Sequence, residues 1–427
     1  MMTLRYGDRG VFVRYLQLAL QRAGYDPGAI DGIFGTRTLD AVTAFQRANG
    51  LTSDGIVGRM TWAQLYPYLS GYTVHVVRAG DTLSSIAVMH NSTVNAIETA
   101  NPEVSPTSLQ IGQRLVVPLP FDVVPTNVPY SYALNTILLD GLTARYPFIK
   151  TQRVGTSVMG KPLEAAVLGN GETEVFYNAS HHANEWITSV LVVKYLENYC
   201  KALVSGEKIA DIRASAIFEN TRLYLIPLVN PDGVDLVTGA LNEDDSYYRR
   251  AQAMTEFYPN IPFPSGWKAN IDGVDLNLGY PAGWEQAKEI KFAQGYTRPG
   301  PRDYVGPAPL SQPENQALAD FTTSHDFMLT LSYHTQGAVI FYKYLDFDPP
   351  RATEIALAFS AASGYAVEET PYESGFAGYK DWYIQTFDRP GYTIEAGRGT
   401  SPLPLRQFPE IYRDNEGILT LGMAMLM

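Results

Sequence analysis

Apolar and polar residues alternate along the first 70 residues with the spacing of short amphipathic helices. Apolar positions within 11–20 recur at helical spacing, which predicts a helix that Gly24 ends. The same spacing within 38–45 predicts a second helix. The pattern therefore indicates a small helical domain, for which we expect the bounds 1–70.

This domain contains an internal repeat. The segment 31–38, DGIFGTRT, returns 23 residues later at 54–61 as DGIVGRMT. Each copy has an Asp-Gly turn, an apolar residue and then a glycine before a threonine that can begin a helix. The copies carry too few oxygen-bearing side chains for an EF-hand loop, so we do not expect a calcium site.

The domain as a whole resembles the peptidoglycan-binding domain of bacterial cell-wall hydrolases. The segments that carry the resemblance are VRYLQ (13–17), DGIFG (31–35), AFQ (44–46) and TW (61–62). The resemblance implies anchoring to the cell wall, whereas the residues by themselves indicate only a compact module of three helices.

Residues 71–119 follow a second pattern. Alternating residues in 72–76 predict a strand, Asp81 or Thr82 is placed to cap a helix, and a second helix and a returning strand follow. The segments GDTL (80–83), IA (86–87), NP (101–102) and GQRL (112–115) resemble those of a LysM module. That resemblance implies binding to glycans that contain N-acetylglucosamine, and a structural spacer is the alternative.

The rest of the chain is a short linker and one large domain. Residues 120–128 contain two prolines and little apolar periodicity, which indicates a semi-rigid linker. Across 129–427, short apolar runs rich in β-branched residues alternate with helical patterns. This alternation predicts an α/β fold with functional residues where strands end. Ser311 and Glu314 have the spacing of a capping box, so we expect Glu314 to cap a helix.

Three histidines follow strand-like runs in this domain: His181, His182 and His334. His182 and Glu185 are three residues apart, and two ligands from one turn can form half of a zinc site. A distant residue must complete such a site, and His334 is the obvious candidate. On spacing alone, hydrogen-bonded structural histidines are the commoner case. His181 lies on the opposite side of the extended chain, and we expect it to pack.

The domain 129–427 resembles the zinc carboxypeptidase (funnelin) family. The resemblance is carried, in the family order, by HANEW (182–186), NPDG (230–233), GVDLN (273–277), SQPE (311–314), His334 and TIE (393–395). It implies a mixed, mostly parallel sheet between helices, and one zinc ion held by His182, Glu185 and His334. It also implies that Glu395 is the general base, at the end of an apolar strand where a carboxylate is costly.

The same resemblance suggests further roles in binding substrate. Either Arg249 or Arg250 is expected to polarise the substrate carbonyl, with Arg249 slightly favoured, and Tyr372 is expected to close over the substrate. Asn277 is expected to bind substrate, but Leu278 replaces the arginine that ordinarily follows it. A guanidinium fork cannot be replaced by an isobutyl group, so recognition of a plain terminal carboxylate by that route is not expected.

This departure fits a subgroup that carries wall-binding modules, the γ-D-glutamyl-meso-diaminopimelate peptidases. The resemblance predicts a zinc metallopeptidase that hydrolyses the γ-D-glutamyl–diaminopimelate bond of peptidoglycan stem peptides. Lys268, Lys380 and Arg398 are candidates for binding the carboxylates of such a substrate. A general carboxypeptidase and a non-catalytic wall-binding protein are the alternatives.

Composition narrows the class of partner. A net charge of -12 disfavours a nucleic-acid binder, and its division into +1 for 1–120 and -13 for 121–427 indicates separate modules. Cys200 is the single cysteine, which excludes an intrachain disulfide. There is no apolar run of about 18 residues and no recognisable leader peptide. We therefore expect no membrane partner, and a cytoplasmic or spore compartment in a sporulating bacterium, with action on the wall.

Overall fold

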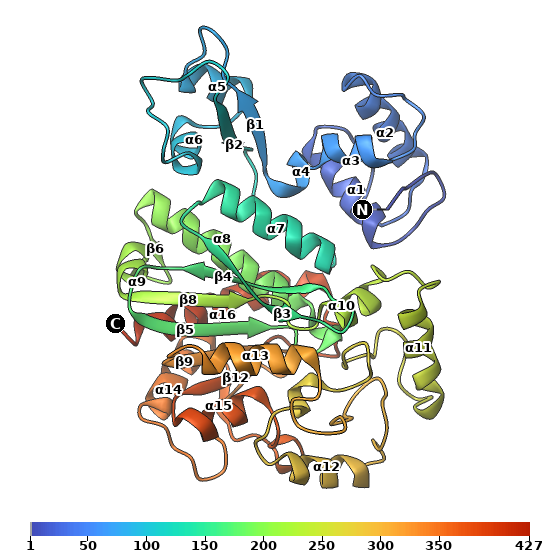
Figure 1. Ribbon diagram of the computed structural model, residues 1–427, viewed down its shortest axis with the longest axis vertical. Helices are drawn as coiled ribbons and strands as arrows, with labels where there is room; N and C mark the ends of the chain where they lie inside the picture. Colours follow the sequence, from blue (N-terminus) through green and yellow to red (C-terminus); the bar gives the residue numbers. More distant parts are fainter. Residues whose placement is uncertain (1) are drawn as a thin grey trace. The chain divides into compact units, whose positions relative to one another are not determined.

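The computed structural model describes residues 2–427, which fold as two compact units (Figure 1). The first unit comprises the described part of Met1–Val128 together with Ala133–Lys150. The second comprises Pro129–Tyr132 and Thr151–Met427. No helix within residues 2–427 has both the length and the apolar character that crossing a bilayer requires.

The N-terminal part of the first unit is helical, as the periodicity predicts. The two expected helices are present, and their apolar faces bury Tyr15, Leu16, Val42 and Phe45. The helices are α1 (Val11–Arg22), α2 (Thr36–Ala48), α3 (Arg59–Leu65) and α4 (Pro67–Ser70).

A glutamine of the preceding helix holds each copy of the repeated loop. Gln17 of α1 donates through Nε2 to Asp31 Oδ1 (2.9 Å) and to the carbonyl of Ile33 (3.1 Å), and its Oε1 accepts from the amide of Gly32 (2.8 Å). Gln46 of α2 repeats these three bonds in the second copy, at 3.1, 2.9 and 3.0 Å. The sequence repeat is therefore a repeated hydrogen-bond pattern between a helix and the loop after it.

Glycines rather than threonines cap the helices of the repeat, although Thr36 is the first residue of α2. Gly35 and Gly58 are the N-caps, and Thr38 and Thr61 occupy the third helical position of α2 and α3. Their hydroxyl oxygens lie 3.3 and 3.2 Å from the amide nitrogens of the two glutamines. The expectation of threonine caps is wrong because the buried glutamine amides use these hydroxyls as acceptors.

The second module has the predicted order of strand, helix, helix and strand. Thr82 rather than Asp81 caps the first helix, since its side chain accepts from the amide of Ser85 (3.1 Å). The elements are β1 (Tyr72–Val76), α5 (Leu83–Met89), α6 (Val94–Ala100) and β2 (Arg114–Pro118), with β1 and β2 antiparallel.

Helix α7 (Tyr132–Arg145) supplies polar contacts to this first unit. The Asp140 carboxylate accepts from the hydroxyls of Tyr66 (2.7 Å) and Tyr72 (3.0 Å). Within 120–128, Val123 and Val128 are buried. Part of the predicted linker therefore contributes to the packed interior rather than spanning solvent.

The second unit is built on an eight-stranded sheet in the order β11-β10-β12-β9-β5-β8-β4-β3. Four neighbouring strands are parallel, in the order β12, β9, β5 and β8. Next to them, β10 pairs antiparallel with β12, and β4 pairs antiparallel with β8, which confirms the predicted mixed sheet. The strands are β3 (Lys150–Thr156), β4 (Pro162–Leu168), β5 (Thr173–Ala179), β8 (Thr221–Ile226), β9 (Leu329–His334), β10 (Val339–Phe341), β11 (Ala366–Glu368) and β12 (Gly391–Glu395).

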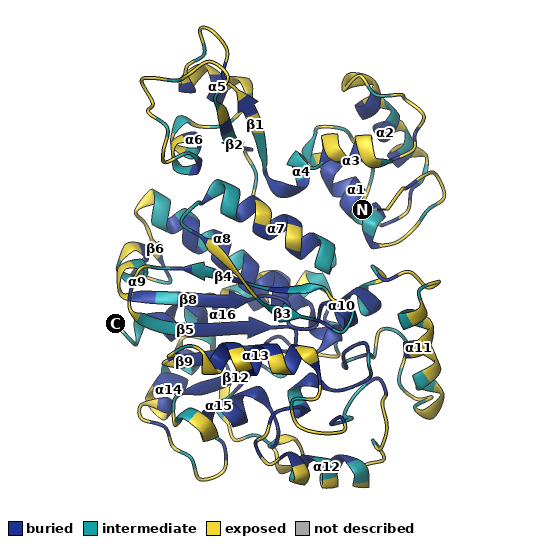
Figure 2. Ribbon diagram, viewed as in Figure 1, coloured by how far each residue is buried: buried dark blue, intermediate teal, exposed yellow. Residues whose placement is uncertain are grey.

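Successive residues of a strand point to opposite faces of the sheet, and in β5 the successive residues Phe176 and Tyr177 are both buried. Helices cover both faces. On one face, Tyr177 of β5 donates its hydroxyl to the carbonyl of Leu419 in α16 (Phe408–Ala424), beside α8 (Ile187–Ser205). On the other face, Phe176 packs on Phe321 of α13 (Pro313–Thr323) and Tyr379 of α15 (Tyr379–Phe387). Figure 2 shows the central strands buried and α13 exposed along its outer side.

The remaining helices and one small hairpin surround this framework. The helices are α9 (Ala214–Asn220), α10 (Pro231–Thr238), α11 (Ser246–Met254), α12 (Trp284–Ala293) and α14 (Ala352–Ser363). The hairpin pairs β6 (Lys208–Ile209) with β7 (Ile212–Arg213). Single 3₁₀ turns occupy Ala183–Glu185, Thr255–Phe257, Leu276–Leu278, Tyr372–Ser374 and Leu405–Gln407.

We expect Gln17→Ala to loosen the first repeated loop, because it leaves the buried amide of Gly32 without an acceptor. The cost is about 1–3 kcal/mol, the usual penalty for an unsatisfied buried donor. Hydrogen exchange of the Gly32 amide in the full chain measures it directly. Gln21→Ala, at an exposed position of the same helix, is the control, and equal exchange rates in the two variants would contradict the expectation.

Candidate functional site

The parallel strands of the sheet bring the candidate residues to one edge. Strand β5 ends at Ala179, three residues before His182, and β9 ends at His334. Strand β12 ends at Glu395, which pairs in register with His334. The carboxyl ends of parallel strands meet at the same edge, so residues from three distant segments become neighbours.

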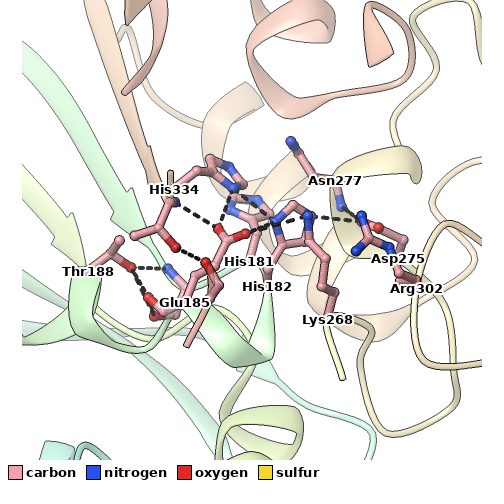
Figure 3. Close-up of polar contacts among 12 residues, drawn as sticks. His181, His182, Glu185, Thr188, Lys268, Asp275, Asn277, Arg302 and His334 are labelled. Atoms are coloured by element: carbon pink, nitrogen blue, oxygen red, sulfur yellow. Dashed lines mark hydrogen bonds and ion pairs between the residues drawn. The ribbon is translucent and has the colours of Figure 1, made fainter. Parts of the chain in front are cut away.

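His182, Glu185 and His334 form a buried cluster whose side chains point toward one another (Figure 3). His182 Nδ1 lies 3.0 Å from Glu185 Oε1, and His334 Nδ1 lies 3.0 Å from Glu185 Oε2. The two Nδ1 atoms are 3.1 Å apart, and one ligand atom from each residue lies within 4.8 Å of the others. Two imidazole nitrogens and one carboxylate converging in this way fit a catalytic zinc ion.

Asp275 orients the first of these ligands. Its Oδ1 lies 3.0 Å from His182 Nε2, and an ionised carboxylate only accepts, so Nε2 holds the proton and Nδ1 is the ligand atom. Burial raises the pKa of Asp275, but His182 and Lys268 outweigh it and keep this pKa far below its usual range. Asp275 is itself held by the amide of Asn277 (3.1 Å).

Lys268 brings a cation to the cluster. Its Nζ lies 3.5 Å from Glu185 Oε1, and the side chain lines the cavity described below. Burial lowers the pKa of Lys268, but the Glu185 and Asp275 carboxylates raise it above its usual value. Lys268 is therefore a charged donor beside the metal ligands.

Glu395 lies at the end of β12 and lines the same cavity. Burial, followed by repulsion from the Glu185 carboxylate, raises the pKa of Glu395 to about 8. A divalent cation among the three ligands would lower this pKa, since a bound ion is the largest local charge. The carboxylate is thus placed to exchange protons at the site.

A cavity of about 340 Å³ is lined by His182, Lys268 and Glu395, among others. Three lysines that line it have acidic neighbours: Lys268 beside Glu185, Lys291 3.0 Å from Asp303, and Lys380 paired with Asp381. Asn277 and Leu278 also line it, so the residue after Asn277 presents an apolar side chain to the cavity. Asn277 Oδ1 accepts from the amide of Tyr379 (3.0 Å).

The structure does not bring Arg249 and Arg250 to this cavity. Both lie on α11 with about half or more of each side chain exposed, and they pair with Asp244 and Asp272. Among the lysines that line the cavity, Lys268 is the one beside Glu185, and it follows Trp267 in the segment before the GVDLN motif. The signal available in the sequence was a lysine directly after a tryptophan, a few residues before the GVDLN motif.

Tyr372 and Arg398 also lie outside the cavity lining. Tyr372 is 62% exposed and packs edge-on against Phe376. Pro371, just before its 3₁₀ turn, and Ser374, the last residue of the turn, do line the cavity. Arg398 is exposed and lies close to the carbonyl of Gly337.

His181 and Glu314 are buried residues with packing or hydrogen-bonding contacts rather than places in the cavity lining. His181 is buried, its Nε2 lies 3.2 Å from the Tyr280 hydroxyl, and its ring stacks on His334, in agreement with a packing role. Glu314 does not form the predicted capping box, since Gln312 is the N-cap and no side chain caps α13. Glu314 instead accepts from the amide of Val158 (3.1 Å), because burial at the second helical position turns it inward.

Comparisons with protein families match every module of the chain. Residues 136–416 match the family described as Zinc carboxypeptidase, residues 9–65 match the Putative peptidoglycan binding domain, and residues 75–118 match the LysM domain. All three resemblances drawn from the sequence are thereby confirmed.

Two bacterial relatives are similar over most of the chain. The first is gamma-D-glutamyl-L-diamino acid endopeptidase 1 of Lysinibacillus sphaericus, 41% identical over 297 residues that cover 70% of this chain and 72% of the relative. The second is the uncharacterized protein YqgT of Bacillus subtilis (strain 168), 36% identical over 276 residues that cover 64% of this chain and 72% of the relative.

Solved structures of low sequence identity share the fold. Bovine thrombin-activatable fibrinolysis inhibitor in complex with tick carboxypeptidase inhibitor gives a TM-score of 0.53 at 16% identity, covering 70% of this chain and 98% of that one. Carboxypeptidase A from Helicoverpa armigera gives 0.52 at 15% identity, covering 92% and 87%. These likenesses confirm the predicted fold class.

We expect the purified chain to carry one divalent metal ion and His334→Gln to lose it, because the variant removes one of three converging ligands. Elemental analysis after dialysis measures the stoichiometry. His325→Gln is the matched control, since His325 contacts Glu174 and not the cluster. Equal metal content in the two variants would rule out the assigned ligand set.

Asp275→Asn should weaken metal binding by about 10–100-fold, as loss of a group that orients a ligand generally does. Competition with a chelator of known affinity measures the change. Asp272→Asn removes a carboxylate that pairs with Arg250 near the surface and serves as the control. If both variants hold metal as tightly as the wild type, Asp275 does not orient His182.

Proposed function

Because the chain belongs to the zinc carboxypeptidase family, we propose that it is a zinc-dependent metallopeptidase of bacterial peptidoglycan, cleaving the stem peptide between γ-D-glutamate and the following diamino acid. The observation that carries the proposal is the buried cluster of His182, Glu185 and His334, with Glu395 beside it. The relative from Lysinibacillus sphaericus, at 41% identity, supports the choice of bond. The two N-terminal family matches support a substrate in the cell wall.

His182, Glu185 and His334 would hold the zinc ion through two Nδ1 atoms and a carboxylate oxygen. When bound, zinc supplies a Lewis acid for the scissile carbonyl and makes water a better nucleophile at neutral pH. Glu395, at the cavity wall, takes the proton of the attacking water and passes it to the leaving amine. Asp275 keeps the His182 ring in the orientation and tautomer that this arrangement needs.

Lys268 takes the role that the sequence pattern assigned to Arg249 or Arg250. Its ammonium lines the cavity beside Glu185 and can donate to the carbonyl oxygen as negative charge develops there. A fixed donor in a buried site stabilises such charge more than one in water does. The two arginines, which pair with Asp244 and Asp272, are left without a part in the reaction.

The two N-terminal modules tether the enzyme to its polymeric substrate. The matched segments 9–65 and 75–118 bind peptidoglycan glycan strands in this proposal. A tether raises the local concentration of stem peptides around the active site without altering the site itself. The enzyme therefore acts on the cell wall.

Two alternatives make different predictions about the substrate. The resemblance assigns recognition of a terminal carboxylate in a general carboxypeptidase to the arginine that ordinarily follows Asn277, and Leu278 replaces that arginine here. A non-catalytic wall-binding protein would not need four chemically suited residues to converge at one strand edge. Incubation with a blocked C-terminal dipeptide distinguishes the first alternative, since only a general carboxypeptidase cleaves it.

We expect the wild type to release L-Ala-D-Glu from L-Ala-γ-D-Glu-meso-diaminopimelate, and Glu395→Gln to lower kcat by about 10²–10⁴-fold, the usual contribution of a general base. Mass spectrometry of the products identifies the bond, and elemental analysis checks that the variant retains metal. Glu368→Gln, an exposed residue of β11 in the same sheet, is the control. An intact tripeptide alongside trimmed ordinary peptides would show that the proposed bond is wrong.

A further inference from the structure

Two of the groups beside the metal ligands, Lys268 and Asp275, belong to one irregular loop. Lys268 Nζ lies 3.5 Å from Glu185 Oε1, and Asp275 Oδ1 lies 3.0 Å from His182 Nε2. The backbone carbonyl of Lys268 also accepts from the amide of Ala183 (2.9 Å), in the turn that carries Glu185. Residues 267–275 form neither a helix nor a strand, so the shape of this loop depends on individual hydrogen bonds.

Asn270 lies in the middle of the loop, is buried, and holds both ends. Its backbone carbonyl accepts from the indole Nε1 of Trp267 (3.1 Å), the residue directly before Lys268. Its backbone amide donates to the carbonyl of Val274 (2.9 Å), and its Oδ1 accepts from the Val274 amide (3.1 Å). Val274 directly precedes Asp275. One asparagine therefore fixes the residue before each of the two functional side chains.

The start of α13 in turn holds Asn270. Its Nδ2 donates to Gln312 Oε1 (2.8 Å) and to Glu314 Oε2 (3.3 Å). The other oxygen of Glu314 accepts from the amide of Val158 (3.1 Å), between β3 and β4. Glu314 is fully buried, where a carboxylate is costly unless donors compensate it. The carboxylate thus ties the loop to a second segment of the domain.

We propose that Asn270 is a positioning residue that, together with Glu314, sets where the Lys268 ammonium stands relative to the metal ligands. The inference rests on the proposed function, in which Lys268 donates to the carbonyl oxygen, and deepens it. In the described chain, Asn270 and Glu314 lie outside the cavity lining, so they act through the shape of the loop. A donor displaced by about 1 Å can cost about 100-fold in rate.

Removal of the Asn270 side chain tests this role. On L-Ala-γ-D-Glu-meso-diaminopimelate, we expect Asn270→Ala to lower kcat by about 100-fold and to leave KM within about 3-fold, because Lys268 donates mainly as charge develops in the transition state. Activity is measured on the metal-loaded chain and expressed per bound ion, so unfolded chain and lost metal cannot imitate the result. Asn198→Ala, which removes a donor from α8 to Tyr412, is the matched control.

A double-mutant cycle shows whether Asn270 acts through Lys268. We expect Asn270→Ala to cost less than about 3-fold in kcat when Lys268→Met is already present, since no ammonium is then left to place. An undiminished loss of about 100-fold in that background would assign Asn270 a general structural role and overturn the inference.

An exchange of donor and acceptor tests the contact between Asn270 and Glu314. Asn270→Asp keeps the acceptor for the loop but sets a carboxylate against Glu314, while Glu314→Gln leaves the Val158 amide or Asn270 Nδ2 without an acceptor. In the double variant the introduced amide can donate to the introduced carboxylate, the Gln312 amide can turn to donate as well, and the number of carboxylates equals that of the wild type. We expect each single substitution to lower kcat by about 10-fold or more, and the double variant to recover at least about 10-fold over Asn270→Asp.

The remaining outcomes separate this inference from the proposed function. If Asn270→Ala keeps the kcat of the wild type, or if the double variant is no faster than Asn270→Asp, the inference is overturned, while γ-bond cleavage by the wild type upholds the proposed function. If the wild type leaves the γ-bond intact, both are overturned.

Discussion

The buried carboxylate of Glu185 is the constraint on which the catalytic unit depends. Glu185 is 1% exposed, and an ionised carboxylate at that depth needs several compensating partners at once. Oε1 lies 3.0 Å from His182 Nδ1 and 3.5 Å from Lys268 Nζ. Oε2 lies 3.0 Å from His334 Nδ1 and accepts from the amide of Thr335 (3.2 Å). These partners come from separate segments, so β5 and β9 must lie side by side before the charge can be buried.

Other charged side chains around the cavity are also compensated, since each is buried together with a partner of opposite sign. Asp275 compensates the proton of His182, Asp303 lies beside Lys291, and Asp381 pairs with Lys380. A cavity of this kind has little net charge, so it selects ligands by the position of each charged group rather than by overall attraction. This explains how a catalytic region of strongly negative composition can accept a substrate with several carboxylates.

The sequence predicted residues whose chemistry is tied to a local motif. It assigned the carbonyl-polarising role to Arg249 or Arg250, and named Lys268 only as a candidate for binding substrate carboxylates. His182 and Glu185 share one turn, and Glu395 ends an apolar strand, so each could be recognised from its neighbours. Arg249 stands in a helix that the structure places at the surface, while Lys268 lies in an irregular segment without periodicity. Composition and spacing say nothing about which of two such cations reaches a cavity.

The sequence by itself determined the modules, the class of fold and the metal-ligand types, because periodicity and short motifs depend on residues close together in the chain. It also determined the repeated loops of the first module, since Gln17 and Gln46 each bind a loop that follows in the chain. Only the tertiary structure decided that Lys380 is buried beside Asp381 and lines the same cavity as Glu395. The physical reason is that burial of a charge depends on all the groups that the fold brings around it, and the Lys380 ammonium also donates to the carbonyl of Lys343, which lies 37 residues earlier in the chain.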